Sequence, residues 1–342
     1  MFNSRFKSLK DLQDAFPTEQ RCIDYLEERR WGVKVVSPFD PTSKVYKCKD
    51  NKYRCKNTGK YFNVKTKLIF HKTSLPLIYW FMAIWLVLSH KKGISSIQLS
   101  KDIGVTQKTA WFMLHRIRKA LGIENDKSNE DDNNDSDGGK LSGTIEVDET
   151  FIGGKNKNRH ADKKVKACQG RSFKDKIPVF GMIQRNGRVI AKVVSDTKSK
   201  GYLILCQKQR NGRVIAKVVS DTKSNTLFSV IHNYVKEGSN LYTDEWNYSD
   251  GANIYYNHRN VNHGAGFYGS GDLTTNHIEG FWALVKRSIM GIYYHWSKQH
   301  MQRYIDECVY RFNTRSLSDK ERFDLFLQNI ECRLTYKELV YG

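Results

Sequence analysis

The sequence has no apolar stretch long enough to cross a membrane. Its one apolar run, Leu75–Leu88, is shorter than the ~20 residues that a bilayer requires, and Pro76 suits the first turn of a buried helix. The opening residues 1–10 are polar and lack the apolar segment of a secretory signal. The seven cysteines do not form a disulfide-like framework, which favours a reducing compartment. We therefore expect a cytoplasmic protein with no membrane partner.

Acidic residues are also scarce relative to basic ones. The 342 residues include 36 Asp and Glu against 57 Lys and Arg, which gives a formal net charge of +21. Such a charge predicts a polyanionic partner, usually nucleic acid, although a merely basic surface would have the same composition. The length is sufficient for two or three domains, each with its own hydrophobic core.

The first 72 residues divide into two expected modules. Residues 1–30 form a polar helical segment in which Pro17 and Thr18 mark a helix start. Residues 31–72 contain short lysine-rich strands with Cys48 and Cys55, typical of a degenerate zinc-ribbon-like module. A tetrahedral zinc site requires further ligands, and the positions expected to hold them carry no complete cysteine set, so we expect no bound zinc.

Residues 73–122 have the pattern of a helix-turn-helix DNA-binding domain. Gly104 is suited to the turn, and Thr106 is a cap for a second helix that extends to Leu121. Side chains of this second helix are the predicted DNA contacts, with those at its N-terminal end placed to reach base edges. They are Gln107, Lys108, Thr109, Arg116 and Arg118. The alternative is an ordinary helical hairpin with a basic, solvated face. Residues 123–142, rich in Asp and Glu, are an expected disordered linker.

The strand predicted at residues 143–154 suggests a metal site. Ile145 and Val147 alternate with Glu146 and Asp148, so one face of the strand is apolar and the other carries carboxylates. Further along the chain, Asp244 ends another predicted strand and Glu279 lies on a predicted helix. If the two strands are neighbours, these carboxylates converge.

Asp148, Asp244 and Glu279 together suit Mg²⁺ or Mn²⁺, which prefer oxygen ligands and support phosphodiester displacement. Lys286 follows Glu279 by nearly two helical turns and therefore shares its face, where it and Arg287 could approach a phosphate backbone. Taken singly, each acid is more simply a capping or solvated residue, and other acids such as Glu146 compete for the role. The order of elements over residues 143–342 indicates an α/β catalytic domain of ribonuclease-H type.

One segment is duplicated. Residues 184–199 recur without a change at 209–224, and an exact pair is better explained by a recent duplication than by a repeat architecture. Both copies are competent strands, but the expected sheet has room for one. We expect the second copy to occupy that place because it leads directly into the following helix.

Three blocks of the chain resemble the DDE transposases of bacterial insertion sequences, specifically the ISXO-type, Merlin-like group. The blocks read IEVDETFIGGK, YTDEWNYSD and NHIEGFWALVKRSIMGIYYHWSKQH. The resemblance implies a ribonuclease-H-like fold, a metal-binding triad at Asp148, Asp244 and Glu279, and a basic catalytic residue at Lys286. It also implies Mg²⁺-dependent cutting and joining of DNA at terminal inverted repeats by a homo-oligomer, in the nucleoid of a prokaryotic cell. An inactive relic that only binds DNA, and a nuclease or resolvase, are the alternatives.

Overall fold

The chain folds into two compact units, and the first of them contains both the beginning and the end of the sequence. The computed structural model describes residues 6–127, 140–153, 160–164, 176–185, 189–193, 224–244, 252–261, 274–328 and 330–341. Unit 1 comprises Met1–Glu124 together with Thr314–Gly342, and unit 2 comprises Asn125–Asn313. The expected catalytic domain at 143–342 therefore extends too far, because its last segment belongs to unit 1. Most of the expected linker at 123–142 lies outside the described residues.

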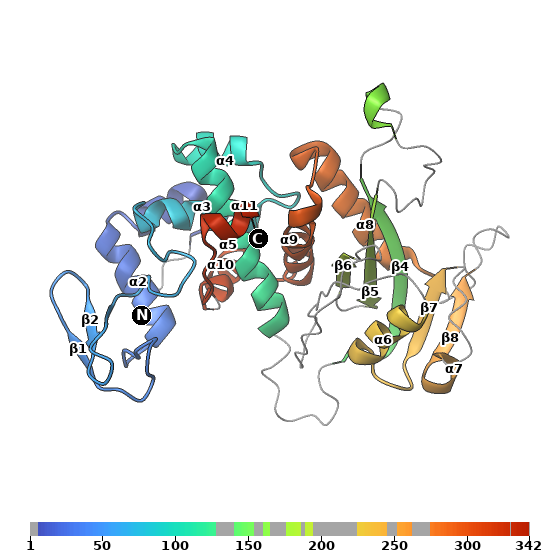
Figure 1. The fold of residues 1–342 in the computed structure, drawn as a ribbon, viewed down its shortest axis with the longest axis horizontal. Helices are drawn as coiled ribbons and strands as arrows, with labels where there is room; N and C mark the ends of the chain where they lie inside the picture. Colours follow the sequence, from blue (N-terminus) through green and yellow to red (C-terminus); the bar gives the residue numbers. More distant parts are fainter. Residues whose placement is uncertain are drawn as a thin grey trace. The chain divides into compact units, whose positions relative to one another are not determined.

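Unit 1 is mainly helical (Figure 1). Its helices are α1 (Leu9–Ala15), α2 (Glu19–Trp31), α3 (Leu77–Ser89), α4 (Ser96–Ile103), α5 (Gln107–Lys127, whose end passes into unit 2), α10 (Asp319–Gln328) and α11 (Tyr336–Tyr341). Thr18 caps α2 as predicted, with its hydroxyl accepting the amide of Arg21 at 3.2 Å.

Helix α10 explains why the end of the chain joins unit 1. Phe323 of α10 packs edge-on against Phe6, Phe81 and Trp85, with ring centroids 5.5, 5.6 and 6.3 Å away. Arg29 of α2 also pairs with Asp324 of α10 at 3.0 Å. Edge-on aromatic pairs stabilise a fold beyond the effect of the apolar area that they bury. Helix α10 is therefore held in unit 1 by side chains that are far from it in the sequence.

A small antiparallel sheet lies within residues 31–72, where we expected a ribbon-like module. Its strands are β1 (Val45–Lys47), β2 (Tyr53–Cys55) and β3 (Tyr61–Phe62), in the order β1-β2-β3. Tyr53, Cys55 and Phe62 form the buried side, while Arg54 and its cross-strand neighbours Tyr46 and Tyr61 lie on the exposed side. Within the described residues, no helix is long and apolar enough to cross a membrane.

Unit 2 is built on a five-stranded mixed sheet. The strands are β4 (Thr144–Ile152), β5 (Ile177–Gln184), β6 (Val189–Val193), β7 (Asn240–Asp244) and β8 (Asn257–Val261), in the order β6-β5-β4-β7-β8. Strands β4, β5 and β6 are antiparallel neighbours, whereas β7 is parallel to β4 and β8 is parallel to β7. Most residues of β8, at the edge of the described sheet, are exposed.

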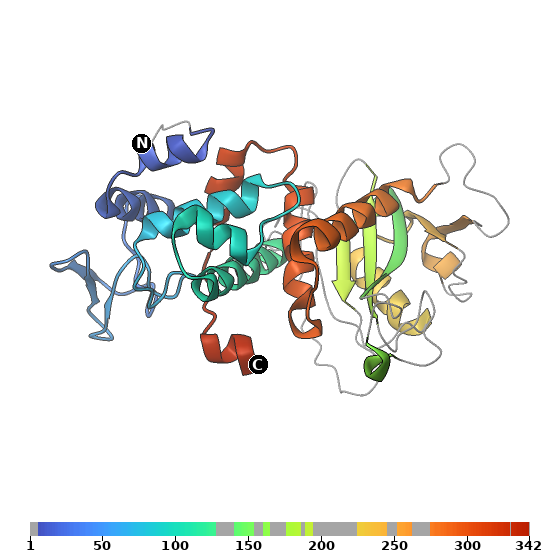
Figure 2. The same ribbon diagram turned by 90° about the horizontal axis from the view of Figure 1, so that it is seen from above.

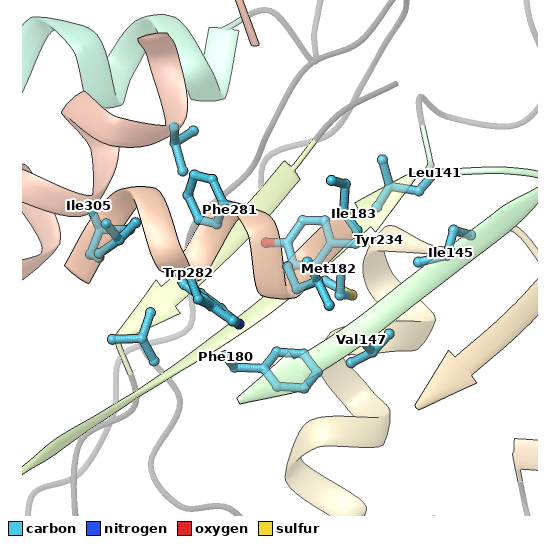
Figure 3. Close-up of a cluster of buried hydrophobic side chains, with 14 of the residues drawn as sticks. Leu141, Ile145, Val147, Phe180, Met182, Ile183, Tyr234, Phe281, Trp282 and Ile305 are labelled. Atoms are coloured by element: carbon cyan, nitrogen blue, oxygen red, sulfur yellow. The ribbon is translucent and has the colours of Figure 1, made fainter. Parts of the chain in front are cut away.

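Helices cover both faces of this sheet. Helix α8 (Asn276–Ser288) lies on one face and α6 (Ser224–Tyr234) on the other, as the two views agree (Figures 1 and 2). Side chains of β4 and β5 meet Phe281 and Trp282 of α8 and Tyr234 of α6 in one core (Figure 3). The predicted helical stretch 275–315 is divided: a π-helical turn at Ile289–Tyr293 and a 3-10 turn at Lys298–His300 separate α8 from α9 (Met301–Asn313). Short helical segments at Ala161–Lys163 and α7 (Ala252–Tyr255) complete the unit.

The first copy of the duplicated segment, not the second, supplies the strand next to β5. Residues 189–193 form β6 and pair with β5 from Ile183↔Val189 to Val179↔Val193. Our expectation that the second copy takes this place is therefore wrong. The first copy follows β5 directly in the chain, so it pairs at the lowest cost in loop entropy. The second copy up to residue 223 lies outside the described residues.

Because the two copies are identical, proline substitutions provide a matched test of this assignment. We expect Ile190→Pro combined with Ala191→Pro to destabilise unit 2 by roughly 3 kcal/mol or more, because consecutive prolines remove a ladder hydrogen bond from β6. The same pair in the second copy, Ile215→Pro with Ala216→Pro, should change stability little. Urea unfolding of both variants measures the difference. If both variants lost equal stability, or the second-copy variant lost more, the second copy rather than the first would form the strand next to β5.

Candidate active site

The register of the sheet places two of the predicted acids side by side along the backbone. Strand β4 pairs in parallel with β7 through Val147↔Thr243, and the next residues along are Asp148 and Asp244. Adjacent strands are ~4.8 Å apart, so these two positions are close. On the other side of Asp148, the paired residue of β5 is Gly181, which has no side chain. The side chain of Asp244 lies outside the described part of the structure.

The third predicted acid, Glu279, lies in the first turn of α8, which covers the face of the sheet that carries Asp148. Glu146 of β4 accepts the backbone amides of His277 and Ile278 at 2.9 and 3.2 Å, so the first turn of α8 lies over the Glu146 face. Since side chains alternate along a strand, Asp148 is on this face too. Glu279 is the residue after Ile278, is exposed, and accepts a hydrogen bond from the hydroxyl of Thr275 at 3.0 Å.

The donor set suits a hard divalent cation, although the described side chains do not by themselves complete a site. Asp148 is partly exposed, and its Oδ1 accepts the amide of Glu149 at 2.7 Å. Carboxylates on two neighbouring strand positions and on a facing helix are the oxygen ligands that Mg²⁺ and Mn²⁺ prefer. Among the residues whose side chains are described, no group of three or more His, Cys, Asp or Glu is arranged to hold a metal.

Glu146, which competed with Asp148 as a ligand in the sequence, has a different role. Its side chain is fully buried, with 0 % exposure, and its two oxygens are already taken. Besides the two amides of α8, Oε1 receives Nε of Arg185 at 2.8 Å and Nδ1 of His277 at 2.8 Å. A carboxylate that is buried and satisfied in this way holds the fold together and is not available to a metal. No sequence signal identified this role or its partner Arg185.

Lys286 and Arg287, predicted to meet the phosphate backbone, are both exposed in the last turn of α8. Nε of Arg287 donates to the carbonyl of Ala283 at 3.1 Å, which directs part of this guanidinium along its own helix. The buried side of α8 consists of Ile278, Phe281, Trp282, Val285 and Ser288. The helix therefore has the acid at its start and the two cations near its end outside the core.

In unit 1, the predicted turn between α4 and α5 has the geometry that its glycine suggested. Gly104 is left-handed, with φ 70° and ψ 35°, a conformation that disfavours other residues. The hydroxyl of Thr106 accepts the amide of Thr109 at 3.2 Å and so caps α5. Gln107 and Lys108 are exposed and Thr109 is partly exposed, so all three remain candidates for DNA contact.

The prediction that Arg116 and Arg118 contact DNA is wrong. They are only 7 % and 1 % exposed. The guanidinium of Arg116 donates to the carbonyls of Leu334, Ile69 and His71 at 3.0, 2.7 and 3.2 Å, and burial lowers its pKa from the ordinary value. Arg116 thus joins distant segments of unit 1. The sequence did not reveal these contacts, because the partners of Arg116 are 45, 47 and 218 positions away in the chain.

Comparison with known proteins relates the chain to transposases. An uncharacterised protein in transposable element ISH50 of Halobacterium salinarum is 25% identical over 206 residues, which are 57% of this chain and 65% of that relative. The chain thus spans less than two thirds of the relative's length. A crystal structure of a pre-cleavage Mos1 transpososome aligns over 96% of this chain and 98% of its own, at 11% identity and a TM-score of 0.24, too low to support any argument about the fold. The family profile described as an ISXO2-like transposase domain matches residues 140–313, just over half of the sequence. The chain therefore belongs to the ISXO2-like transposases.

Proposed function

We propose that this insertion-sequence transposase binds terminal inverted repeats through unit 1 and cleaves and joins DNA with a ribonuclease-H-like unit 2. The observation that carries the proposal is the register of β4 and β7, which sets Asp148 level with Asp244 on parallel neighbours, with α8 beginning on the face that carries Asp148. The mixed five-stranded sheet with helices on both faces supports the ribonuclease-H-like assignment.

Asp148, Asp244 and Glu279 would hold the Mg²⁺ or Mn²⁺ ions. When bound, such ions activate a water or 3′-hydroxyl and stabilise the leaving oxygen of a phosphodiester. Lys286 and Arg287, exposed on the helix of Glu279, would neutralise the phosphates of the strand being cut. The enzyme would act as a homo-oligomer on paired ends, in the nucleoid of the prokaryotic cytoplasm.

DNA recognition is assigned to the α4–Gly104–α5 helix pair, in the manner of a helix-turn-helix. Gln107 and Thr109 lie at the N-terminal end of α5, where side chains of a second helix reach base edges. Lys108 is exposed beside them, with its ammonium 5.1 Å from the ring centre of Tyr336. We assign base reading to Gln107 and Thr109 and phosphate contact to Lys108.

Replacing one lysine tests whether DNA binding depends on a specific phosphate contact or on the protein's overall positive charge. We expect Lys108→Ala to reduce the slope of log affinity against log salt by ~0.9, because one counterion is no longer released. Lys10→Ala is the matched control, since Lys10 is exposed on α1 in the same unit and pairs with Asp14. Fluorescence anisotropy with duplex DNA at several salt concentrations gives both slopes. Identical slopes for Lys108→Ala and the parent would place the phosphate contacts on another surface.

The proposed reaction is tested with DNA carrying the inverted repeats that flank the gene. Two end-containing fragments are incubated with the full chain and Mg²⁺ or Mn²⁺, and products are separated by size. Cleavage at the repeat ends with joining to a second DNA supports the proposal. Cleavage without joining would make the protein a nuclease or resolvase, and binding without cleavage would make it an inactive relic.

A further inference from the structure

Arg185 contacts the two strands that carry proposed catalytic acids, and the residue before the N-cap of the helix that carries the third. Its Nε donates to Glu146 of β4 at 2.8 Å, and its Nη2 donates to the carbonyl and the hydroxyl of Thr274 at 2.9 and 3.0 Å. Its guanidinium also lies 5.0 Å from the ring centre of Tyr242 in β7. Thr274 immediately precedes Thr275, the N-cap of α8. A single planar side chain thereby joins two strands and the start of a helix, which a lysine ammonium does not reproduce.

The positions of these contacts relative to the acids are regular. Glu146 and Tyr242 are cross-strand partners, and each is followed on its own strand, at the next position on the same face, by Asp148 and Asp244 respectively. Arg185 therefore contacts both strands at positions two residues before Asp148 and Asp244. Its own amide donates to the carbonyl of Thr144 at 3.0 Å, so the backbone that carries the side chain is tied to β4 as well.

The same network fixes where α8 begins. The first amides of a helix have no partner within the helix, and the N-terminus favours negative charge. The Glu146 carboxylate meets both needs by accepting the amides of His277 and Ile278, and His277 adds its ring Nδ1 at 2.8 Å. Because a carboxylate only accepts, Nδ1 carries the hydrogen. Glu279 is the next residue after this anchored pair, so the position of its backbone depends on Glu146.

We propose that Arg185 and Glu146 are positioning residues that hold Asp148, Asp244 and Glu279 at their mutual distances. The inference rests on the proposed function, in which these three acids bind the metal. Neither Arg185 nor Glu146 is a metal ligand here. Glu146 has 0 % exposure and its oxygens are occupied, while Arg185 acts through the backbone of the elements that it joins.

Arg185→Lys tests the proposal in the full chain, because it keeps the positive charge and removes the planar fork. The matched control is Arg29→Lys, which alters an arginine that likewise bonds to a carboxylate, Asp324 at 3.0 Å, but in unit 1. Two properties are measured in the absence of DNA. Hydrogen exchange of peptides covering 274–282 reports the anchoring of α8, and electron paramagnetic resonance of free Mn²⁺ reports metal affinity.

We expect Arg185→Lys to exchange about tenfold faster in the first turn of α8 and to bind Mn²⁺ 10–100-fold more weakly, the usual effect of losing a group that orients metal ligands. Arg29→Lys should leave both unchanged. Unchanged exchange in Arg185→Lys overturns the anchoring, and faster exchange with parental Mn²⁺ affinity overturns the positioning role. A parent protein that binds no Mn²⁺ would overturn the proposed function instead, and the exchange comparison would still decide whether Arg185 anchors α8.

Discussion

Asp148→Asn is expected to abolish metal-dependent DNA cleavage while DNA binding remains at the parental level. The substitution keeps the shape of the side chain and removes the charge that attracts a divalent cation. Metal ions contribute several kcal/mol of transition-state stabilisation in such reactions, so a loss of about a thousandfold or more in rate is expected. Asp244→Asn and Glu279→Gln should behave alike, since residues that act as a unit give losses that do not add.

The control for this experiment lies one residue away. Glu149 is also on β4, but strand alternation puts it on the opposite face from Asp148. Glu149→Gln should therefore retain cleavage, and circular dichroism should show both variants folded. Cleavage is followed with labelled end-containing DNA at saturating Mn²⁺, and binding by anisotropy. Parental cleavage by Asp148→Asn would remove this residue from the site, and equal losses in the two variants would contradict the assignment of the catalytic face.

The second large effect is expected on stability. Arg116→Met should destabilise unit 1 by roughly 3–5 kcal/mol, because hydrogen bonds from a charged group are lost and buried carbonyls are left unpaired. The carbonyls belong to Leu334, Ile69 and His71, which lie in separate parts of unit 1. Arg116 also stacks 4.5 Å from the ring centre of Phe112, and a methionine keeps part of that packing.

Denaturant unfolding measures this loss, and Arg21→Met, an exposed position on α2, serves as the control with an expected change within about 0.5 kcal/mol. Any folded fraction of Arg116→Met should bind DNA with the parental salt slope, since the guanidinium does not face solvent. A stable Arg116→Met protein with a reduced slope would instead show that Arg116 contacts phosphate, as the sequence had suggested.

Local patterns predicted those parts of the structure whose causes are local. Alternation of Ile145 and Val147 with acids gave β4, and Gly104 with Thr106 gave the start of α5. In these elements the residue types and their spacing act within one or two turns or strand positions.

The sequence failed where the partner is distant or where two segments are identical. Arg116 was predicted to be a surface cation because its partners, Ile69, His71 and Leu334, are far from it in the sequence. Glu146 and Asp148 look alike in the sequence, and only the start of α8 against Glu146 separates the buried acid from the partly exposed one. The two copies of the duplicated segment have no local difference, so connection length, not composition, decides which one pairs with β5.

The division of the chain into units has a consequence for biosynthesis. Unit 2 is inserted within unit 1, whose helix α10 is needed to complete a core of Phe6, Phe81 and Trp85. Chains emerge from the ribosome N-terminus first, and domains generally fold as units. The first part of unit 1, which carries the proposed DNA-recognition helices, is therefore synthesised first, but its core is completed only after unit 2 has left the ribosome. A nascent or truncated chain that ends before residue 314 would contain the proposed catalytic acids but lack helix α10 and therefore the complete core of unit 1. On the proposed function, such a chain would not recognise DNA until its translation is complete.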